Sequence, residues 1–155
     1  MLCKADTEFI PSLSSRKLTT QDLSDDEHEK NVEPFEYYCQ MIKQSFVLTV
    51  KNDQVVGFLS FIPSYILKIE LEEFRCDYIS TIIVKPEYRG NGITERMYMT
   101  LFNHRAHSVY ATRTWSTNIS HLHILEKLGF REIHRIPNER GENIDTIYFA
   151  KKGDE

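Results

Sequence analysis

The sequence predicts a single mixed α/β domain with a largely antiparallel sheet. Two β-rich runs, at 46–50 and 55–61, enclose the turn residues Asn52-Asp53, a pattern typical of an antiparallel hairpin. A β-branched run at 79–84 then leads through a glycine-rich turn into a helical pattern at 93–104. With 155 residues and 41% hydrophobic content, the chain can bury one sizeable core without a metal or disulfide.

The N-terminal part is expected to add a strand and two helices. Residues 12–18 predict a first strand, and Thr19 or Thr20 is suited to cap a short helix after it. A second helix follows Pro34, because proline suits the first turn of a helix. Its apolar residues recur with helical spacing and predict the face turned to the core: Phe35, Tyr38, Met41 and Ile42.

The remaining elements follow in order along the chain. Residues 66–75 suit a short helix or a strand equally well, and residues 109–115 predict a strand. A helix is expected to start at Asn118 and to end at Gly129, since glycine commonly follows a helix. Strands near 130–136 and 144–150 complete the predicted sheet.

The turn after residues 79–84 predicts a pocket for a phosphate-bearing ligand. Pro86 cannot donate to a sheet ladder, so the strand should stop at about Val84. Gly90 and Gly92 permit backbone angles that let successive amides converge at the start of the next helix, where free amides attract anions. Arg89 adds a planar cation suited to phosphate oxygens. From the turn alone, an ordinary strand–turn–helix corner is an equal alternative.

Two segments in order resemble the GNAT superfamily of acyl-CoA-dependent N-acyltransferases. Residues 84–94 look like the acyl-CoA pyrophosphate loop of that family, Arg/Gln-x-x-Gly-x-Gly/Ala. Arg89 and Gly92 match it, whereas Thr94 stands where glycine or alanine is usual. Residues 118–130 are similar to the family's Asn-x7-Glu-Lys-Leu-Gly-Phe segment, and the resemblance covers roughly residues 78–135.

The resemblance implies a fold, a reaction and a set of binding residues. The GNAT fold is a mixed, mainly antiparallel twisted sheet of six to seven strands with about four helices, and its central strands splay apart to hold acetyl-CoA. The implied reaction transfers the acetyl group of acetyl-CoA to a primary amine, of a small molecule or a peptide, by direct attack in a ternary complex. Asn118 would cap its helix or bind the pantetheine arm. The backbone of the central strand, at Ile82, Ile83 and Val84, would bind that arm and polarise the acetyl carbonyl. The loop amides would hold the pyrophosphate, and they belong to Arg89, Gly90, Asn91, Gly92, Ile93 and Thr94.

Leu125 is the main departure from the family pattern. Many members carry a tyrosine there, which protonates the departing thiolate of CoA, and leucine cannot do so. His121 lies one helical turn earlier on the same face, so it is our first candidate for the acid, with a merely local hydrogen bond as the alternative. Tyr110 and Tyr78 are further candidates. The missing tyrosine also supports a second hypothesis, a catalytically weak or inactive acyl-CoA-binding or regulatory module, and a structural domain that binds no nucleotide is a third.

The general base and the acceptor site are less well marked. Asp77, near the start of the central strand, is our candidate base, against the alternative of a solvated aspartate at a strand end. Trp115, the only tryptophan, is a candidate to line the acceptor site, although packing is the usual role of a large aromatic residue.

Charge and cysteine usage restrict the partners. The net charge of −4 hides an uneven distribution, with an acidic run at 22–36 and an excess of cations at 85–135. The acidic run favours a cationic amine as ligand, and the cations favour a phosphate-rich cofactor. Solvated helix faces are the alternative explanation. An acidic chain without a platform of stacking aromatics disfavours nucleic acid. Cys3, Cys39 and Cys76 are widely spaced and predict neither disulfides nor a metal site, which fits the cytoplasm.

Two expectations concern the membrane and the oligomeric state. No run approaches the roughly 20 apolar residues that cross a bilayer, and the N-terminus lacks a leader pattern, so we expect no membrane partner. The resemblance is compatible with a homodimer, because sheet edges and terminal strands often support dimers in this family. We expect one domain, 1–155.

Overall fold

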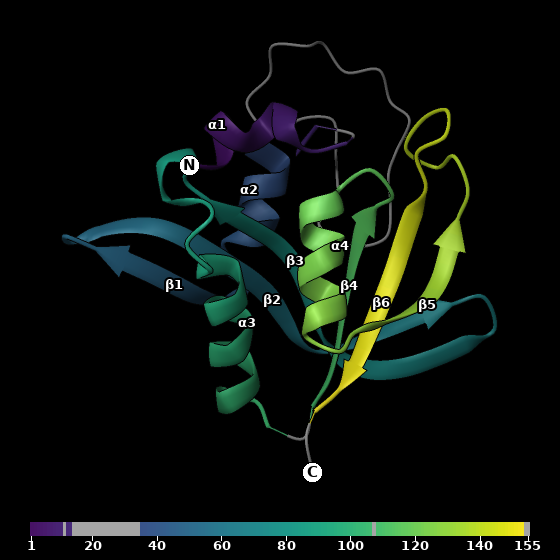
Figure 1. The fold of residues 1–155 in the computed structure, drawn as a ribbon. Coiled ribbons are helices and arrows are strands. Elements are labelled where there is room, and N and C mark those ends of the chain that lie inside the picture. Colours follow the sequence, from purple (N-terminus) through teal and green to yellow (C-terminus); the bar gives the residue numbers. More distant parts are fainter. Residues whose placement is uncertain (11, 14–34, 107, 154–155) are drawn as a thin grey trace.

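The computed structural model, which describes residues 1–10, 12–13, 35–106 and 108–153, contains one six-stranded sheet with helices on both faces (Figure 1). The strand order is β1-β2-β3-β4-β6-β5, and only the β3–β4 pairing is parallel. The strands are β1 Ser45–Lys51, β2 Gln54–Ile69, β3 Glu72–Val84, β4 Val109–Trp115, β5 Arg131–Ile136 and β6 Thr146–Lys152. The helices are α1 Leu2–Ala5, α2 Phe35–Met41, α3 Ile93–His104 and α4 Ile119–Lys127.

The predicted mixed, mainly antiparallel sheet is confirmed, and the ambiguous segment at 66–75 is resolved. Asn52 and Asp53 have φ of 48° and 59°, which is the two-residue turn that matches the twist of a hairpin. Residues 66–75 form a second hairpin, between the end of β2 and the start of β3, with Glu70 at φ 53° in its turn. Within the described residues no helix has the length and apolar character needed to span a membrane.

The predicted core face of α2 is wrong at three of its four residues and right at Met41. Phe35 is 66% exposed, and Tyr38 and Ile42 are also exposed, whereas Tyr37 and Met41 are buried. Both faces carry aromatic residues at helical spacing, so periodicity alone does not choose between them. The choice is made by tertiary contacts, because the Tyr37 hydroxyl hydrogen-bonds the Thr81 hydroxyl at 2.5 Å.

Some predictions lie outside the described residues. They are most of the strand at 12–18, the caps Thr19 and Thr20, and most of the acidic run at 22–36.

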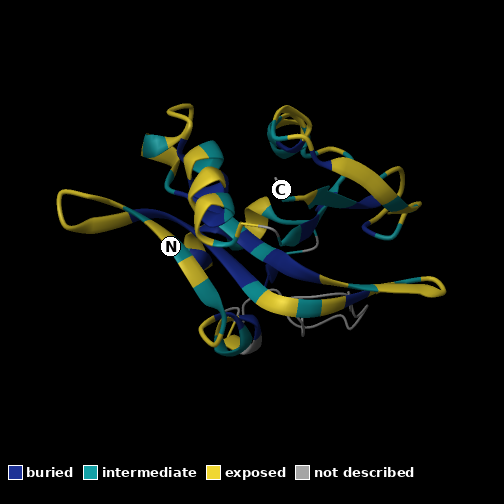
Figure 2. Ribbon diagram, turned by 90° about the horizontal axis from the view of Figure 1, so that it is seen from below, coloured by how far each residue is buried: buried dark blue, intermediate teal, exposed yellow. Residues whose placement is uncertain are grey.

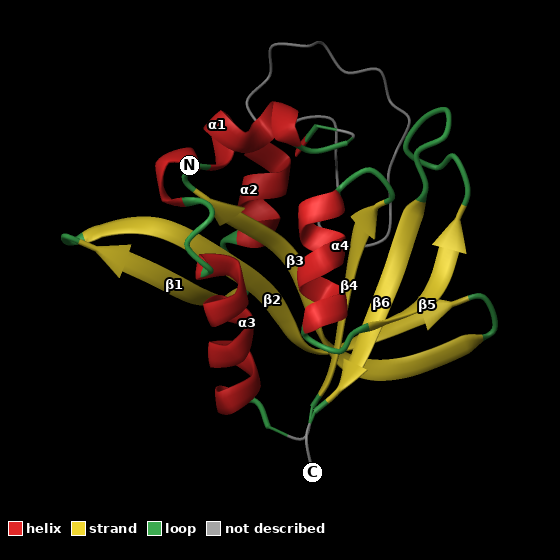
Figure 3. Cartoon of the chain, viewed as in Figure 1, coloured by secondary structure: helices red, strands yellow, loops and turns green. Residues whose placement is uncertain are grey.

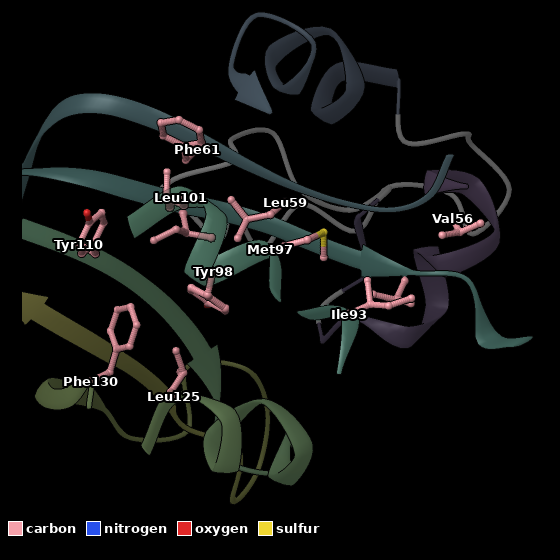
Figure 4. Close-up of a cluster of buried hydrophobic side chains, with 12 residues drawn as sticks. Val56, Leu59, Phe61, Ile93, Met97, Tyr98, Leu101, Tyr110, Leu125 and Phe130 are labelled. Atoms are coloured by element: carbon pink, nitrogen blue, oxygen red, sulfur yellow. The ribbon is translucent and has the colours of Figure 1, made fainter. Parts of the chain in front are cut away.

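Two hydrophobic clusters cover opposite faces of β2 and β3, and Figure 2 shows the buried residues along the middle of the sheet. The first cluster packs α3 and α4 against Leu59 and Val84 (Figure 4). The second packs α1 and α2 against Phe58 and Ile83. Gly57 brings the start of α3 close to the sheet, because a Cβ there would lie 3.3 Å from the Ile93 side chain. The position of α3 therefore depends on a glycine in β2.

Strands β3 and β4 pair over a short distance and then diverge, as Figure 3 shows. The pairs are Asp77↔Tyr110, Tyr78↔Ala111 and Ile79↔Thr112. At Ile79 the Thr112 hydroxyl also donates to the backbone carbonyl, at 3.0 Å. The next residue, Ser80, forms a β-bulge, because no residue of β2 stands opposite it in the β2–β3 ladder. We call this divergence the fork; it is the splay that the resemblance implied.

An ion pair lies at the base of the fork. Asp77 is only 2% exposed, and it accepts hydrogen bonds from Arg105 Nε at 2.8 Å, Arg105 Nη2 at 3.0 Å and the Ser64 backbone N–H at 3.0 Å. Burial raises the pKa of Asp77, but these hydrogen bonds and the charge of Arg105 outweigh it, so the pKa is lowered overall. The pair joins the loop after α3 to the middle of β3.

Removing Arg105 should therefore destabilise the fold. We expect Arg105→Met to lower the free energy of unfolding at pH 7 by about 1–3 kcal/mol, because a buried carboxylate loses its counter-charge while half of the arginine was in water. The lowered pKa of Asp77 means that the contribution is complete above about pH 4 and is lost as the pH falls through the folded-state value.

Urea unfolding at several pH values measures this effect. Lys68→Met is the matched control, because it removes one partner of an exposed ion pair with Glu73 and should cost less than about 0.5 kcal/mol. Equal effects of the two substitutions, or an Arg105 effect that does not diminish as the pH is lowered from 7 into the acid range, would contradict the assignment.

Candidate active site

A cleft of about 590 Å³ opens at the fork. It is lined by the end of β3, the turn that follows, the first turns of α3 and α4, the end of β4, and Glu8 and Phe9 of the N-terminal segment. Consecutive residues of a strand point to opposite faces, so Thr112 and Arg113 bring both faces of the sheet into the lining. The cleft thus passes through the sheet where its strands separate.

The open edge of β3 presents backbone groups to this cleft. The Lys85 N–H donates to the Val56 carbonyl at 2.9 Å, which makes Val84↔Gly57 a non-hydrogen-bonded pair of the antiparallel ladder. By alternation, the N–H and C=O of Ile82 and Val84 face away from β2 and towards the cleft, whereas those of Ile83 are directed at β2. The Ile83 side chain is buried beneath α1 and α2.

The turn after β3 places a set of free amides at the start of α3. Gly90 and Gly92 have φ of +73° and +67°, in the left-handed region, and Gly92 is the residue before the helix. Among the described residues, no acceptor binds the backbone N–H groups from Gly90 to Glu95. Asn91 steadies the turn by donating to the Tyr88 and Arg89 carbonyls at 3.2 and 3.0 Å. The Ile93 side chain is buried in the core, and Thr94 lines the cleft.

Arg89 is paired with a carboxylate that sequence analysis did not identify. Its Nη2 donates to both carboxylate oxygens of Glu8, at 2.7 and 3.0 Å, and its Nε donates to the Val84 carbonyl at 3.0 Å. The cation expected to meet phosphate is therefore held by the N-terminal segment. No local pattern around Glu8 marks it as a cleft residue.

Asn118 caps the N-terminus of α4, which is one of the two roles expected for it. Its side-chain oxygen accepts from the His121 backbone N–H at 3.4 Å, and its Nδ2 donates to the Thr114 hydroxyl at 3.2 Å. Both polar atoms thus have partners within the protein, although Asn118 also lines the cleft.

His121 lines the cleft and is paired with Tyr98 of α3. Its Nε2 lies 2.9 Å from the Tyr98 hydroxyl, and its Nδ1 has no partner among the described residues. Burial lowers the pKa of His121 to about 4 and raises the pKa of Tyr98, so both groups are neutral at pH 7. Leu125 is 0% exposed and lies near Phe130 in the core (Figure 4). Sequence analysis missed Tyr98, because its spacing with Leu101 is that of an ordinary core stripe.

The other candidates are spread around the fork. Asp77 does not line the cleft, and its carboxylate is engaged by Arg105, so its role as a base stays a prediction without geometric support. The Tyr110 hydroxyl donates to the Arg105 carbonyl at 2.7 Å. Tyr78 is buried, with no partner for its hydroxyl among the described residues. Trp115 lines the cleft and contacts Phe9, with ring centroids 5.8 Å apart.

Comparison with known proteins identifies the class of this fold and site. Residues 15–130 match the acetyltransferase (GNAT) family. The chain therefore belongs to the GNAT acetyltransferase family. A comparison with curated protein sequences found no significant match.

Solved structures of GNAT acetyltransferases share the fold. A GNAT acetyltransferase from Bacillus cereus ATCC 10987 has a TM-score of 0.62 at 20% identity, over 81% of this chain and 84% of that one. An aminoglycoside 6'-N-acetyltransferase complexed with coenzyme A has a TM-score of 0.59 at 20% identity, over 77% and 83%. The ribosomal-protein-S18-alanine N-acetyltransferase from Escherichia coli has a TM-score of 0.59 at 17% identity, over 72% and 70%. The chain spans about two thirds of the length of several such neighbours.

The glycine at the start of α3 supplies a test of the loop. Gly92→Val places a β-branched residue at φ +67°, which should force the turn open and separate the amides. We expect CoA binding, measured by calorimetry, to fall at least about tenfold, which corresponds to about 1.4 kcal/mol.

Gly129→Val is the matched control. Gly129 has φ +81° after α4 and lies outside the cleft lining, so the variant carries similar backbone strain and should keep its CoA affinity. Normal CoA binding by Gly92→Val would refute the loop assignment.

Proposed function

We propose that this protein transfers the acetyl group of acetyl-CoA to a primary amine, on a small molecule or a peptide, within a ternary complex. The observation that carries the proposal is the row of free amides from Gly90 to Glu95, at the mouth of a cleft whose other wall is the open edge of β3. Family membership and a structural neighbour complexed with coenzyme A support the same assignment.

The residues present fit acetyl-CoA. The amides of Gly90, Asn91, Gly92, Ile93 and Thr94 suit a pyrophosphate, because free N–H groups at a helix start attract anions. Arg89 contributes once it exchanges the Glu8 carboxylate for a phosphate. The open edges of Ile82 and Val84 suit the pantetheine amides, which would extend the sheet as a short added strand. Ile83 then serves the site through packing rather than through its backbone.

Acetyl-CoA supplies an activated acetyl thioester; the chain supplies orientation and hydrogen bonds. A free N–H on the β3 edge donates to the acetyl carbonyl oxygen, where negative charge develops as the amine nitrogen attacks. The new C–N bond forms as the C–S bond breaks, the amine gives its proton to solvent water and the sulfur leaves as a thiolate. A thiolate with an ordinary thiol pKa of about 8.5 is a tolerable leaving group, so the loss of an acid at Leu125 does not remove activity.

His121 acts on the departing sulfur as a neutral donor. When the Tyr98 hydroxyl donates to Nε2, the ring proton resides on Nδ1, which has no other partner among the described residues. A neutral imidazole then stabilises the thiolate by a hydrogen bond rather than by full proton transfer. The raised pKa of Tyr98, caused by burial, keeps its hydroxyl protonated in this arrangement.

A catalytically weak or inactive acyl-CoA-binding module is the alternative function. Leu125 is buried in the core, so no side chain at the usual tyrosine position reaches the cleft. Acetylation of any amine at a rate above the uncatalysed one would remove this alternative.

Other properties stay predictions. The neighbours are named for an aminoglycoside and for a protein alanine, so both small-molecule and peptide acceptors remain in the proposal. A location in the cytoplasm agrees with the free cysteines Cys3, Cys39 and Cys76, and a single domain and a homodimer are carried over from the sequence.

His121→Ala should lower kcat by roughly 10²-fold with unchanged acetyl-CoA affinity, because one donor to a developing anion is lost. The pKa of about 4 makes His121 neutral throughout pH 6–8, so the ratio of wild-type to variant kcat should be constant across that range. His104→Ala, which removes an exposed histidine from α3 outside the cleft lining, is the control. A ratio that follows a titration near pH 6.5 would contradict the neutral donor, and an unchanged kcat would place the acid elsewhere.

Thermal unfolding with acetyl-CoA, free CoA and ATP tests the proposed cofactor. At a ligand concentration of about a hundred times Kd, binding should add about 2.7 kcal/mol to the free energy of unfolding and raise Tm by several degrees. Both CoA species should stabilise the protein and ATP should not. A cooperative transition unmoved by all three would overturn the proposed function.

A further inference from the structure

We propose that the acceptor carries a free carboxylate beside its amine, as amino acids do, and that Arg113 binds this carboxylate. The inference rests on the proposed function and names its substrate class. It assigns the acceptor to the face of the sheet opposite α3 and α4, where Arg113 and Trp115 line the cleft.

Arg113 has donors to spare. Its one hydrogen bond among the described residues runs from Nη1 to the Tyr148 hydroxyl, at a long 3.4 Å, and it has no ion pair within them. A guanidinium carries five N–H donors, in a fork that matches a carboxylate. By contrast, Arg105 and Arg135 hold carboxylates at 2.8–3.0 Å. Among the residues that the structure describes, Arg113 has no such partner.

Tyr78 provides a second, independent sign of a missing ligand. It is 0% exposed, and no hydrogen-bond partner for its hydroxyl lies within the described residues. Tyr78 pairs with Ala111, two residues before Arg113 on β4, so both side chains extend from the same face. A buried hydroxyl without a partner is costly and uncommon in proteins. The charge of Arg113 acts on Tyr78, so the unpartnered hydroxyl lies in the surroundings of the guanidinium, although Tyr78 itself does not line the cleft.

Glu139 decides which kind of anion fits. Its charge acts on Arg113, but the two side chains form no ion pair, and its Oε2 is buried without a partner. One guanidinium facing one nearby carboxylate leaves little net positive charge, which disfavours a dianionic phosphate and favours a single carboxylate. Glu139 does not itself line the cleft, so it acts on a bound anion only through its charge. A small molecule with one carboxylate beside its amine therefore matches Arg113.

Position supports the same assignment. Arg113 follows Thr112, the last β4 residue paired with β3, so it lies directly beside the fork. An acceptor held there has its amine near the open edge of β3, where the acetyl group is proposed to lie. Phe9 and Trp115 form an adjoining aromatic wall of the cleft, suited to the carbon skeleton of the acceptor.

The test compares acceptors in matched pairs on the full chain with acetyl-CoA. Each pair is an amino acid and its carboxamide, which keeps the side chain and removes the negative charge. Because the carboxamide also has a lower amine pKa, kcat/KM is referred to the concentration of neutral amine. The wild type should prefer the amino acid in kcat/KM by roughly ten- to hundredfold, the expected range for hydrogen bonds to a charged group. Arg113→Met should reduce this ratio to near one, while Arg113→Lys should retain part of it.

Arg75→Met is the matched control, because Arg75 is exposed on β3, away from the cleft, and its loss should leave the ratio unchanged. Thermal unfolding with acetyl-CoA confirms that each variant is folded and binds the cofactor. A wild type that acetylates carboxamides as well as amino acids, or an unchanged ratio in Arg113→Met, would overturn this inference and leave the proposed function standing. Acetylation of neither series by the folded wild type would overturn this inference alone, because the proposed function is overturned by an unfolding transition that acetyl-CoA and CoA leave unmoved.

Discussion

The site depends on one constraint, the restriction of β3–β4 pairing to three residue pairs. Two parallel strands with free edges would gain hydrogen bonds by continuing to pair, so the chain must hold them apart. The Ser80 bulge interrupts the β2–β3 ladder at the point where β3 separates from β4. At the same point the Thr112 hydroxyl of β4 donates to the Ile79 carbonyl of β3, which is the last link before the strands diverge. Beyond it, clusters on opposite faces fix β3, with Val84 held under α3 and Ile83 over α1 and α2. The open edge is thus kept open by packing.

The way helix α3 is held fixes the position of the free backbone amides at its start. Its first residue, Ile93, packs closely over Gly57, and the loop after its last turn is joined to β3 by Arg105 and Asp77. Because both ends are anchored, the amides before α3 cannot turn away to find acceptors within the protein. Donors held in place before a ligand arrives cost little reorganisation when it binds. The unsatisfied amides are therefore a consequence of how α3 is held.

Local signals in the sequence were sufficient for most of the fold and for one end of the site. The turn at Asn52-Asp53, the helix start after Gly92 and the cap at Asn118 each depend on neighbouring residues only, and each was predicted correctly. What failed depends on contacts distant in sequence. The core face of α2 is selected by Thr81, 44 residues away, and the Arg89 partner Glu8 lies 81 residues away. Tyr98 and His121 meet only because α3 and α4 share one cluster.

The Glu8–Arg89 pair links the two ends of the cleft. A phosphate that takes the Nη2 group of Arg89 displaces the Glu8 carboxylate, so binding there exchanges one anion for another and gains less than binding to an unpaired arginine. The released segment is also the one that carries Phe9, whose ring contacts Trp115 on the acceptor side. Binding free energies are reciprocal, so any acceptor that stabilises Phe9 against Trp115 also alters how readily Arg89 accepts phosphate. The N-terminal segment would consequently be part of both proposed binding sites, although it lies far from both motifs in the sequence.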